Sequence, residues 1–418
     1  MAVSDAPRQA DLDTCVHCGL CLNACPTYRE LHVEMDSPRG RIYQMVQVAN
    51  GAPITDAYMQ HIDLCLACRA CETACPSGVK YGRLVEAARA DIENRVRRPL
   101  AARFVRSLVF DHLLPSRANL KLAGAALRFY QASGLQKLVH GLLPKRIQEL
   151  ESLAPTVESP TFYQHMGKVF PAQGERKHRV ALLSGCVANL CFARLNEATV
   201  RVLQANGCEV TIHDGQTCCG ALHVHAGLRD SARKLARQNI DALVDGGFDA
   251  ILTNAGGCGS TLKEYDELLE GDDRARRFAH LVKDVNEFLA SIELNPRMGE
   301  VRATVTYQDS CHLAHGQRVR SAPRQLLRRV PGLTLEEMRL SDMCCGSAGI
   351  YNVVHTDMSM ALLEKKMDSV NATSAERIVT ANPGCMLQLR AGVERHGHGQ
   401  QVFHVMEILD EAYSRAGS

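Results

Sequence analysis

The stretch Cys15–Pro26, CVHCGLCLNACP, specifies the first structural unit, and the chain repeats it at Cys65–Pro76 as CLACRACETACP. In each copy, two residues lie between the first and second cysteines, and two lie between the second and third. Three residues then separate the third cysteine from the fourth, which proline follows. Three thiolates so close together on one loop can bind three corners of a single iron–sulfur cubane. The spacing therefore predicts a [4Fe-4S] cluster at each copy.

The fourth cysteine of each run points away from the first three, and with this spacing it is typical for it to ligate the other of two clusters. Cluster one is then expected to take Cys15, Cys18, Cys21 and Cys75, and cluster two Cys65, Cys68, Cys71 and Cys25. Tetrahedral zinc also binds C-x2-C pairs, but it has no use for a third cysteine at this spacing. Apolar residues at helical spacing flank both runs, so residues 1–100 are predicted to form a helical ferredoxin domain.

The composition excludes several classes of protein. Eighteen cysteines in 418 residues are too many for incidental core thiols, and a chain this long builds its own cores without a disulfide framework. The N-terminal residues lack the apolar stretch of a secretory signal, which favours reduced, metal-binding cysteines in the cytoplasm. The net charge of +2 shows no nucleic-acid footprint. No apolar run is long enough to predict a transmembrane segment.

A second duplication fills the rest of the chain. The first copy contains Cys186, Cys218-Cys219-Gly220 and Cys258, and the second contains Cys311, Cys344-Cys345-Gly346 and Cys385. The matching cysteines are 125, 126, 126 and 127 residues apart, and their neighbours agree, as in LTNAGGC and VTANPGC. A repeat of this length indicates a duplicated domain, expected at residues 178–296 and 297–418 after a helical connector and linker at 101–177.

Each half alternates strand-like and helix-like segments, which predicts an α/β fold of parallel βαβ units. Val180–Leu183 and DAILTN at 249–254 read as buried strands, and Leu195–Ala205 reads as a helix. The key cysteines follow predicted strands, and ligands in such folds gather at the carboxyl ends of the strands. The four cysteines of each half are therefore expected to converge on one site.

Three interpretations of these sites compete. An iron–sulfur cluster in at least one half is favoured; four thiolates also satisfy zinc, and buried cysteines can be structural. Cys191 and Cys208 have no counterparts in the second half and are expected to be core thiols. The histidine pairs His223/His225, His312/His315 and His396/His398 are expected to be solvated or hydrogen-bonded to loops rather than to bind metal.

A helical two-cluster ferredoxin followed by two C…CCG…C halves resembles the iron–sulfur subunit of glycolate oxidase (glycolate dehydrogenase). The segments CVHCGLCLNACPTYRE, DSPRGRIYQM and CETACPSGVKYGRLVE carry the resemblance most specifically. It implies a subunit, not catalytic alone, that takes electrons from separate FAD-binding subunits oxidising glycolate to glyoxylate. It further implies transfer towards a membrane quinone or another respiratory acceptor, in the cytoplasm or peripherally on the inner face of the cell membrane.

Related families leave alternatives open. The chain also resembles the iron–sulfur subunits of lactate and anaerobic glycerol-3-phosphate dehydrogenases, and of heterodisulfide reductase, where substrate binds at a CCG cluster. In the last family each half ends in C-x2-C and supplies a fifth ligand. Here Thr261 and Gln388 stand in those places. The departure favours an ordinary four-thiolate site over the heterodisulfide reductase type.

Overall fold

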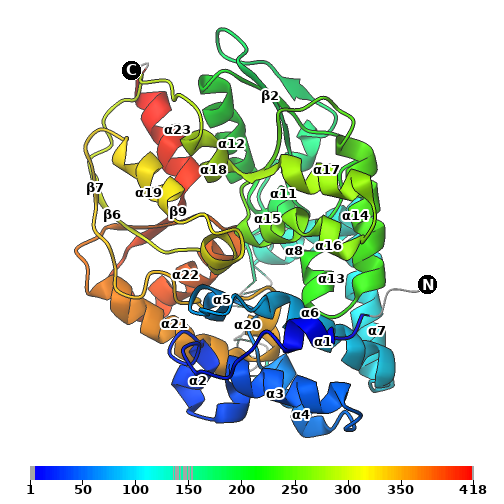
Figure 1. Cartoon of the computed structure of the whole chain (residues 1–418). Coiled ribbons are helices and arrows are strands. Elements are labelled where there is room, and N and C mark those ends of the chain that lie inside the picture. Colours follow the sequence, from blue (N-terminus) through cyan, green and yellow to red (C-terminus); the bar gives the residue numbers. More distant parts are fainter. Residues whose placement is uncertain are drawn as a thin grey trace.

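The computed structural model describes residues 5–134, 136, 141, 143, 144, 148, 151 and 154–416 of the chain. A helical region carrying the two N-terminal cysteine loops packs beneath two α/β halves (Figure 1). No helix in the described ranges combines the length and apolarity that crossing a membrane requires.

The secondary-structure elements described in the N-terminal region are all helices, as the sequence predicts. Its helices are α1 (Gln9–Leu12), α2 (Pro26–Leu31), η1 (Glu34–Asp36), α3 (Pro38–Ala49), α4 (Asp56–Asp63), α5 (Ala70–Thr73) and α6 (Tyr81–Arg95). Helix α3 begins where the Ser37 side chain accepts a hydrogen bond from the Gly40 N–H, with Pro38 in the first turn. Ile42 and Met45 of α3 pack with Leu84 and Val85 of α6 in a core that the cysteine loops border.

The connector is helical in its described part and then adds a strand. Its helical elements are α7 (Leu100–Ser107), the π-helical turn η2 (Leu108–Leu113), α8 (Arg117–Ala132) and η3 (Phe162–His165); most of residues 135–153 lie outside the described residues. Strand β1 (Val169–Phe170), within the segment predicted as linker, pairs antiparallel with β3. A strand of two residues is too short to show an alternation of apolar and polar residues, so the sequence pattern gives no sign of β1.

The first half holds a five-stranded sheet in the order β1-β3-β2-β4-β5, parallel except at β1. Its elements are β2 (His178–Leu182), α11 (Ala188–Cys191), α12 (Ala193–Ala205), β3 (Cys208–Thr211), α13 (Ala221–His225), α14 (Arg229–Leu243), β4 (Ala250–Thr253), α15 (Gly256–Lys263), α16 (Tyr265–Leu268), α17 (Asp273–Leu281), β5 (Val282–Asp284) and α18 (Val285–Ala290). Every residue of β4 is buried, as expected for a strand covered on both faces.

The second half repeats this topology in a parallel sheet of order β7-β6-β8-β9. Its elements are β6 (Ala303–Tyr307), the π-helical turn η4 (His312–Gly316), α19 (Ser321–Arg328), β7 (Leu333–Leu335), α20 (Tyr351–Val354), α21 (Thr356–Asn371), β8 (Arg377–Thr380), α22 (Pro383–His396), β9 (Gln401–His404) and α23 (Val405–Arg415). The duplication extends to detail, since both α18 and α23 begin with a capping box, at Asp284/Glu287 and His404/Glu407.

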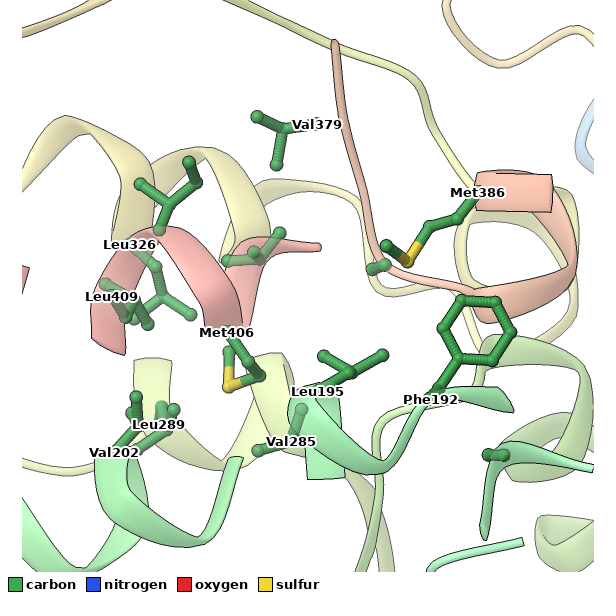
Figure 2. Close-up of a cluster of buried hydrophobic side chains, with 14 of the residues drawn as sticks. Phe192, Leu195, Val202, Val285, Leu289, Leu326, Val379, Met386, Met406 and Leu409 are labelled. Carbon is green, nitrogen blue, oxygen red and sulfur yellow. The ribbon is translucent and has the colours of Figure 1, made fainter. Parts of the chain in front are cut away.

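The two halves share one hydrophobic core. Helix α12 packs against α23, and α18 packs against α19, so equivalent helices exchange partners across the interface. Leu195 and Val202 of α12 meet Met406 and Leu409 of α23 there, with Leu289 of α18 beside them (Figure 2). Because this core is continuous, the positions of the two halves are fixed relative to each other.

Candidate iron–sulfur sites

The two N-terminal cysteine loops differ in exposure. Cys18 is exposed, and Cys15, Cys21 and Cys75 are partly buried. All four residues predicted to bind cluster two, namely Cys65, Cys68, Cys71 and Cys25, are buried. Cluster one is thus expected at the surface and cluster two in the interior.

The thiols interact across the two loops. Cys75 adds to the negative potential at Cys15, and Cys25 adds to that at Cys68 and Cys71. Cys25 also acts on Cys21, so it lies between the two sets. Burial, followed by the neighbouring thiols, raises the pKa of Cys68 and Cys71 well above the ordinary value. Such thiols ionise readily only when a metal supplies the positive charge, which fits iron as their partner.

A buried arginine stands beside the predicted ligands of cluster two. The Arg41 guanidinium is fully buried and donates hydrogen bonds to the His61 carbonyl at 2.6 Å and to Thr27 Oγ1 at 3.2 Å. It also pairs with Asp36 Oδ1 at 3.3 Å. The charges of the Cys65 and Cys25 thiols favour its protonated form. A permanent positive charge therefore lies next to this site.

Hydrogen bonds also reach the sulfurs of this site. The Ala67 N–H donates to Cys65 Sγ at 3.4 Å, and the Tyr81 hydroxyl donates to the same sulfur at 3.7 Å. Thr27 Oγ1 lies 3.2 Å from Cys25 Sγ. Such contacts, with Arg41, are the means by which a protein adjusts an iron–sulfur reduction potential. Sequence reasoning missed these residues; a charged residue inside the apolar stripe of the predicted helix at Arg41 was the available signal.

The first CCG half brings its four predicted cysteines together. The Cys186 thiol donates to Cys218 Sγ at 3.6 Å, and hydrogen bonds connect Cys218 with Cys219 and Cys219 with Cys258. The hydrogen bond to Cys218 and burial raise the pKa of Cys186 well above its ordinary value.

The second half has the same chain of contacts, from Cys311 to Cys344, then Cys345, then Cys385. In addition, the Asn382 amide donates to Cys385 Sγ at 3.3 Å. Gly346, which follows the cysteine pair, has φ +92°, and a Cβ there would lie 2.4 Å from the Ser359 carbonyl oxygen. Only glycine fits this turn, which explains the CCG pattern.

The second half also touches the buried ferredoxin loop. Cys68 and Cys344 belong to one small apolar cluster with Tyr351, and Cys311 packs against it. The Tyr351 hydroxyl donates to the Leu64 carbonyl at 2.9 Å, and His312 Nε2 lies 2.9 Å from the Ala67 carbonyl.

The first half also touches this loop, since Arg69 donates to Ser260 Oγ at 3.2 Å and pairs with Glu264. A cavity lies beside its cysteines. It measures about 370 Å³ and adjoins Cys186 and Cys218. Leu114 and Leu120 of the connector line it, together with Tyr163, whose hydroxyl donates to the Cys186 carbonyl at 3.3 Å.

The other histidines and cysteines that the sequence analysis singled out are hydrogen-bonded, exposed or buried in the core. His223 Nε2 contacts the Phe110 carbonyl at 2.7 Å, and His225 Nδ1 contacts Glu86 at 2.9 Å. His315 Nδ1 contacts Thr73, whereas His396 and His398 are exposed. Cys191 and Cys208 are buried in the core shared by the halves.

The positions of the missing fifth ligands are filled by buried polar side chains. Thr261 is buried, and Gln388 donates to Ser359 Oγ at 2.9 Å. Within the described residues, no three histidine, cysteine or acidic side chains surround a point closely enough to hold a single ion. A cluster bonds each thiolate to a different iron, so its ligands need not meet at one point. The sets of four thiols, which apart from Cys18 are buried or partly buried, fit that group.

The fold and these thiol sets define an iron–sulfur protein, and comparison with protein families agrees. Residues 11–79 match the 4Fe-4S dicluster domain, and residues 180–263 and 305–390 match the cysteine-rich CCG domain. Residues 101–154 match the linker region of the glycolate oxidase iron-sulfur subunit. The chain is an iron–sulfur cluster protein with a ferredoxin-like N-terminal domain and two CCG domains.

Relatives that match nearly the whole chain show to which family of iron–sulfur proteins it belongs. A protein of Bacillus subtilis (strain 168) named "Probable glycolate oxidase iron-sulfur subunit" is 42% identical over 97% of this chain and 94% of its own length. The "Glycolate oxidase iron-sulfur subunit" of Escherichia coli (strain K12) is 34% identical over 97% of this chain and 95% of its own. "Lactate utilization protein A" of Exiguobacterium sp. (strain ATCC BAA-1283 / AT1b) is 30% identical, over 57% of this chain and 99% of its own. The chain belongs to the glycolate oxidase iron–sulfur subunit family.

Proposed function

We propose that this chain is the electron-transfer subunit of a complex that oxidises glycolate to glyoxylate on separate FAD-binding subunits. The observation that carries the assignment is the match over 97% of the chain to two subunits of this name. The lactate relative matches 57% of the chain, which supports that substrate less. We place the complex in the cytoplasm or on the inner face of the cell membrane, where it passes electrons to quinone or another respiratory acceptor.

We further propose the crossed ligand sets, with Cys75 completing cluster one and Cys25 completing cluster two. The interactions of Cys15 with Cys75, and of Cys25 with Cys68 and Cys71, support this arrangement. Each CCG half would supply a four-thiolate site. The first half would use Cys186, Cys218, Cys219 and Cys258, and the second half Cys311, Cys344, Cys345 and Cys385. Iron–sulfur and zinc occupancy are distinguished by measuring iron, zinc and acid-labile sulfide on the full chain.

The domain boundaries that we propose are residues 1–100, 101–177, 178–296 and 297–418.

The exposed loop of cluster one is where we expect the flavoprotein to dock. Val16 and Leu20 flank Cys18 and are 68% and 61% exposed. Exposed apolar side chains around a site that must exchange electrons are typical of a partner surface. Clusters supply one-electron steps when bound, and the chain's part is to hold them at fixed positions between the partner and the interior.

The test is the dependence on flavoprotein. Glycolate oxidation removes two electrons with protons, which a flavin accepts and thiol-bound clusters do not. The purified chain is expected to show no glycolate-dependent dye reduction, and addition of the FAD-binding subunits is expected to restore it. Turnover by the flavin-free chain alone would overturn the proposal and favour a self-sufficient enzyme.

A further inference from the structure

The two CCG halves are alike in their cysteine contacts but differ in their surroundings. In the second half Cys344 shares an apolar cluster with Cys68 of the ferredoxin loop, and Cys311 packs against the same cluster. Cys68 and Cys344 also interact electrostatically, as do Cys68 and Cys311. In the first half, Cys219 and Cys258 pack in an apolar cluster that, among the described residues, contains no residue of the ferredoxin region.

Direct hydrogen bonds hold the second half against the buried loop. Tyr351 of α20 reaches the Leu64 carbonyl, and His312 reaches the Ala67 carbonyl, on either side of Cys65. These bonds connect His312, next to Cys311, and Tyr351, which packs with Cys344, to the backbone that carries the predicted cluster-two ligands. The distance between the two sites is therefore set by packing and by main-chain contacts.

The first half meets the second half through its own cysteine helix. A Cβ built on Gly256 at the start of α15 would lie 2.8 Å from Ser310 Oγ, and one on Gly257 would lie 3.9 Å from His312 Nδ1. Cys258 follows these glycines, and Ser310 and His312 flank Cys311. The second half thus packs its cysteines against Cys68 and also meets the Cys258 helix of the first half, although it comes last in the sequence. The first half reaches the same loop through Arg69, which bonds to Ser260 and Glu264 and not to a cysteine.

We propose that electrons pass from the Cys68 site to the second CCG half and only from there to the first. The proposal rests on the electron-transfer function proposed above and adds the order of its sites. One electron moves at a time; the donor site is oxidised and the acceptor site is reduced, with no bond made or broken and no proton transferred. The first half, beside its cavity, is then the terminal site of the chain.

The test is the magnetic coupling of cluster two, measured by EPR on the full chain reduced with dithionite. Because the electrons come from dithionite, a wrong glycolate assignment would not affect the result. In the wild type the signal of reduced cluster two is expected to show its coupling to cluster one and a further broadening from a paramagnetic site in the second half. Cys344→Ser should remove this broadening, and the equivalent substitution Cys218→Ser in the first half should leave it.

A second pair of variants guards against damage to the ferredoxin loop. Cys385→Ser removes a predicted ligand of the second half that is not part of the apolar cluster of Cys68 and Cys344, and Cys258→Ser is its counterpart in the first half. Cys385→Ser should abolish the broadening while the iron and sulfide of the N-terminal clusters remain. Broadening lost in the first-half variants, lost equally in both halves or unchanged in every variant would overturn the proposal.

Discussion

At the scale of single residues, the contrast between cluster one and cluster two lies in what surrounds their thiols. Cys18 meets solvent, whereas the Cys65 sulfur accepts hydrogen bonds from Ala67 and Tyr81. Arg41 adds a buried positive charge beside it. The cysteine spacing alone predicted the candidate ligands, because ligands on one short loop are a local property of the sequence. It could not predict Arg41 or Tyr81, whose role depends on how helices α3 and α6 pack around the loop.

Replacing Arg41 tests this local electrostatic account. Arg41→Gln is expected to lower the midpoint potential of cluster two, because reduction adds negative charge that the guanidinium no longer stabilises. It should also lower the free energy of unfolding by about 3 kcal/mol, since the buried Asp36 loses its ion pair with Arg41 and keeps the contact with His61 Nδ1 at 2.9 Å. An EPR-monitored redox titration and a denaturation curve measure the two effects.

Arg39→Gln is the matched control. Arg39 pairs with Glu34 near the surface, so its loss should cost about 0–1 kcal/mol and leave cluster two unchanged. An unaltered cluster-two potential in Arg41→Gln, or equal shifts in the two clusters, would contradict the account.

At the scale of elements, the duplication is visible both in the sequence and in the structure, but the residues at equivalent positions differ in charge. Asp284 caps α18 and His404 caps α23, and both are buried. Burial raises the pKa of Asp284 to about 7 and lowers that of His404 to about 4. The similarity of VKDVNEFL and VFHVMEIL, the segments that contain the two caps, reflects the duplication. It gave no sign of the opposite titration, which follows from burial.

The two caps are expected to have opposite pH dependence. Unfolded histidine titrates near 6.5, above the folded value, so the unfolded state binds more protons and stability rises with pH. Between pH 4 and 6.5 this effect should raise the free energy of unfolding of the wild type by about 3 kcal/mol, and His404→Asn should lack this increase. For Asp284 the folded pKa is the higher one, so its contribution is present at low pH and is lost as pH rises towards 7.

Thermal unfolding midpoints measured from pH 4 to 7 test this pair. In both variants the asparagine oxygen can accept the capping hydrogen bond, which Asp284 Oδ1 or His404 Nδ1 accepts in the wild type. Asp284→Asn should become more stable relative to wild type as pH rises, and His404→Asn less stable. Parallel pH profiles for the two variants would show that the caps do not titrate as described.

At the scale of the whole molecule, contacts between regions do not follow the order of the sequence. The second CCG half, at the C-terminal end, contacts the N-terminal ferredoxin loop through Cys344 and Tyr351. The periodicity of apolar residues and the spacing of the cysteines predicted the α/β halves and their cysteine sets, because both are local properties of the sequence. The contact between Cys68 and Cys344 joins residues far apart in the chain, on surfaces with no local signature, so it required the structure.

The most direct test of the electron-carrier assignment is rapid mixing of glycolate with the complex of this chain and its FAD-binding subunits. In the wild type, flavin reduction should be followed by bleaching of iron–sulfur absorbance and by quinone reduction. In Cys71→Ser, flavin reduction should keep its rate while quinone reduction falls to background; Cys191→Ser, which alters a buried core thiol, should behave as wild type. Quinone reduction at the wild-type rate in Cys71→Ser would contradict the account.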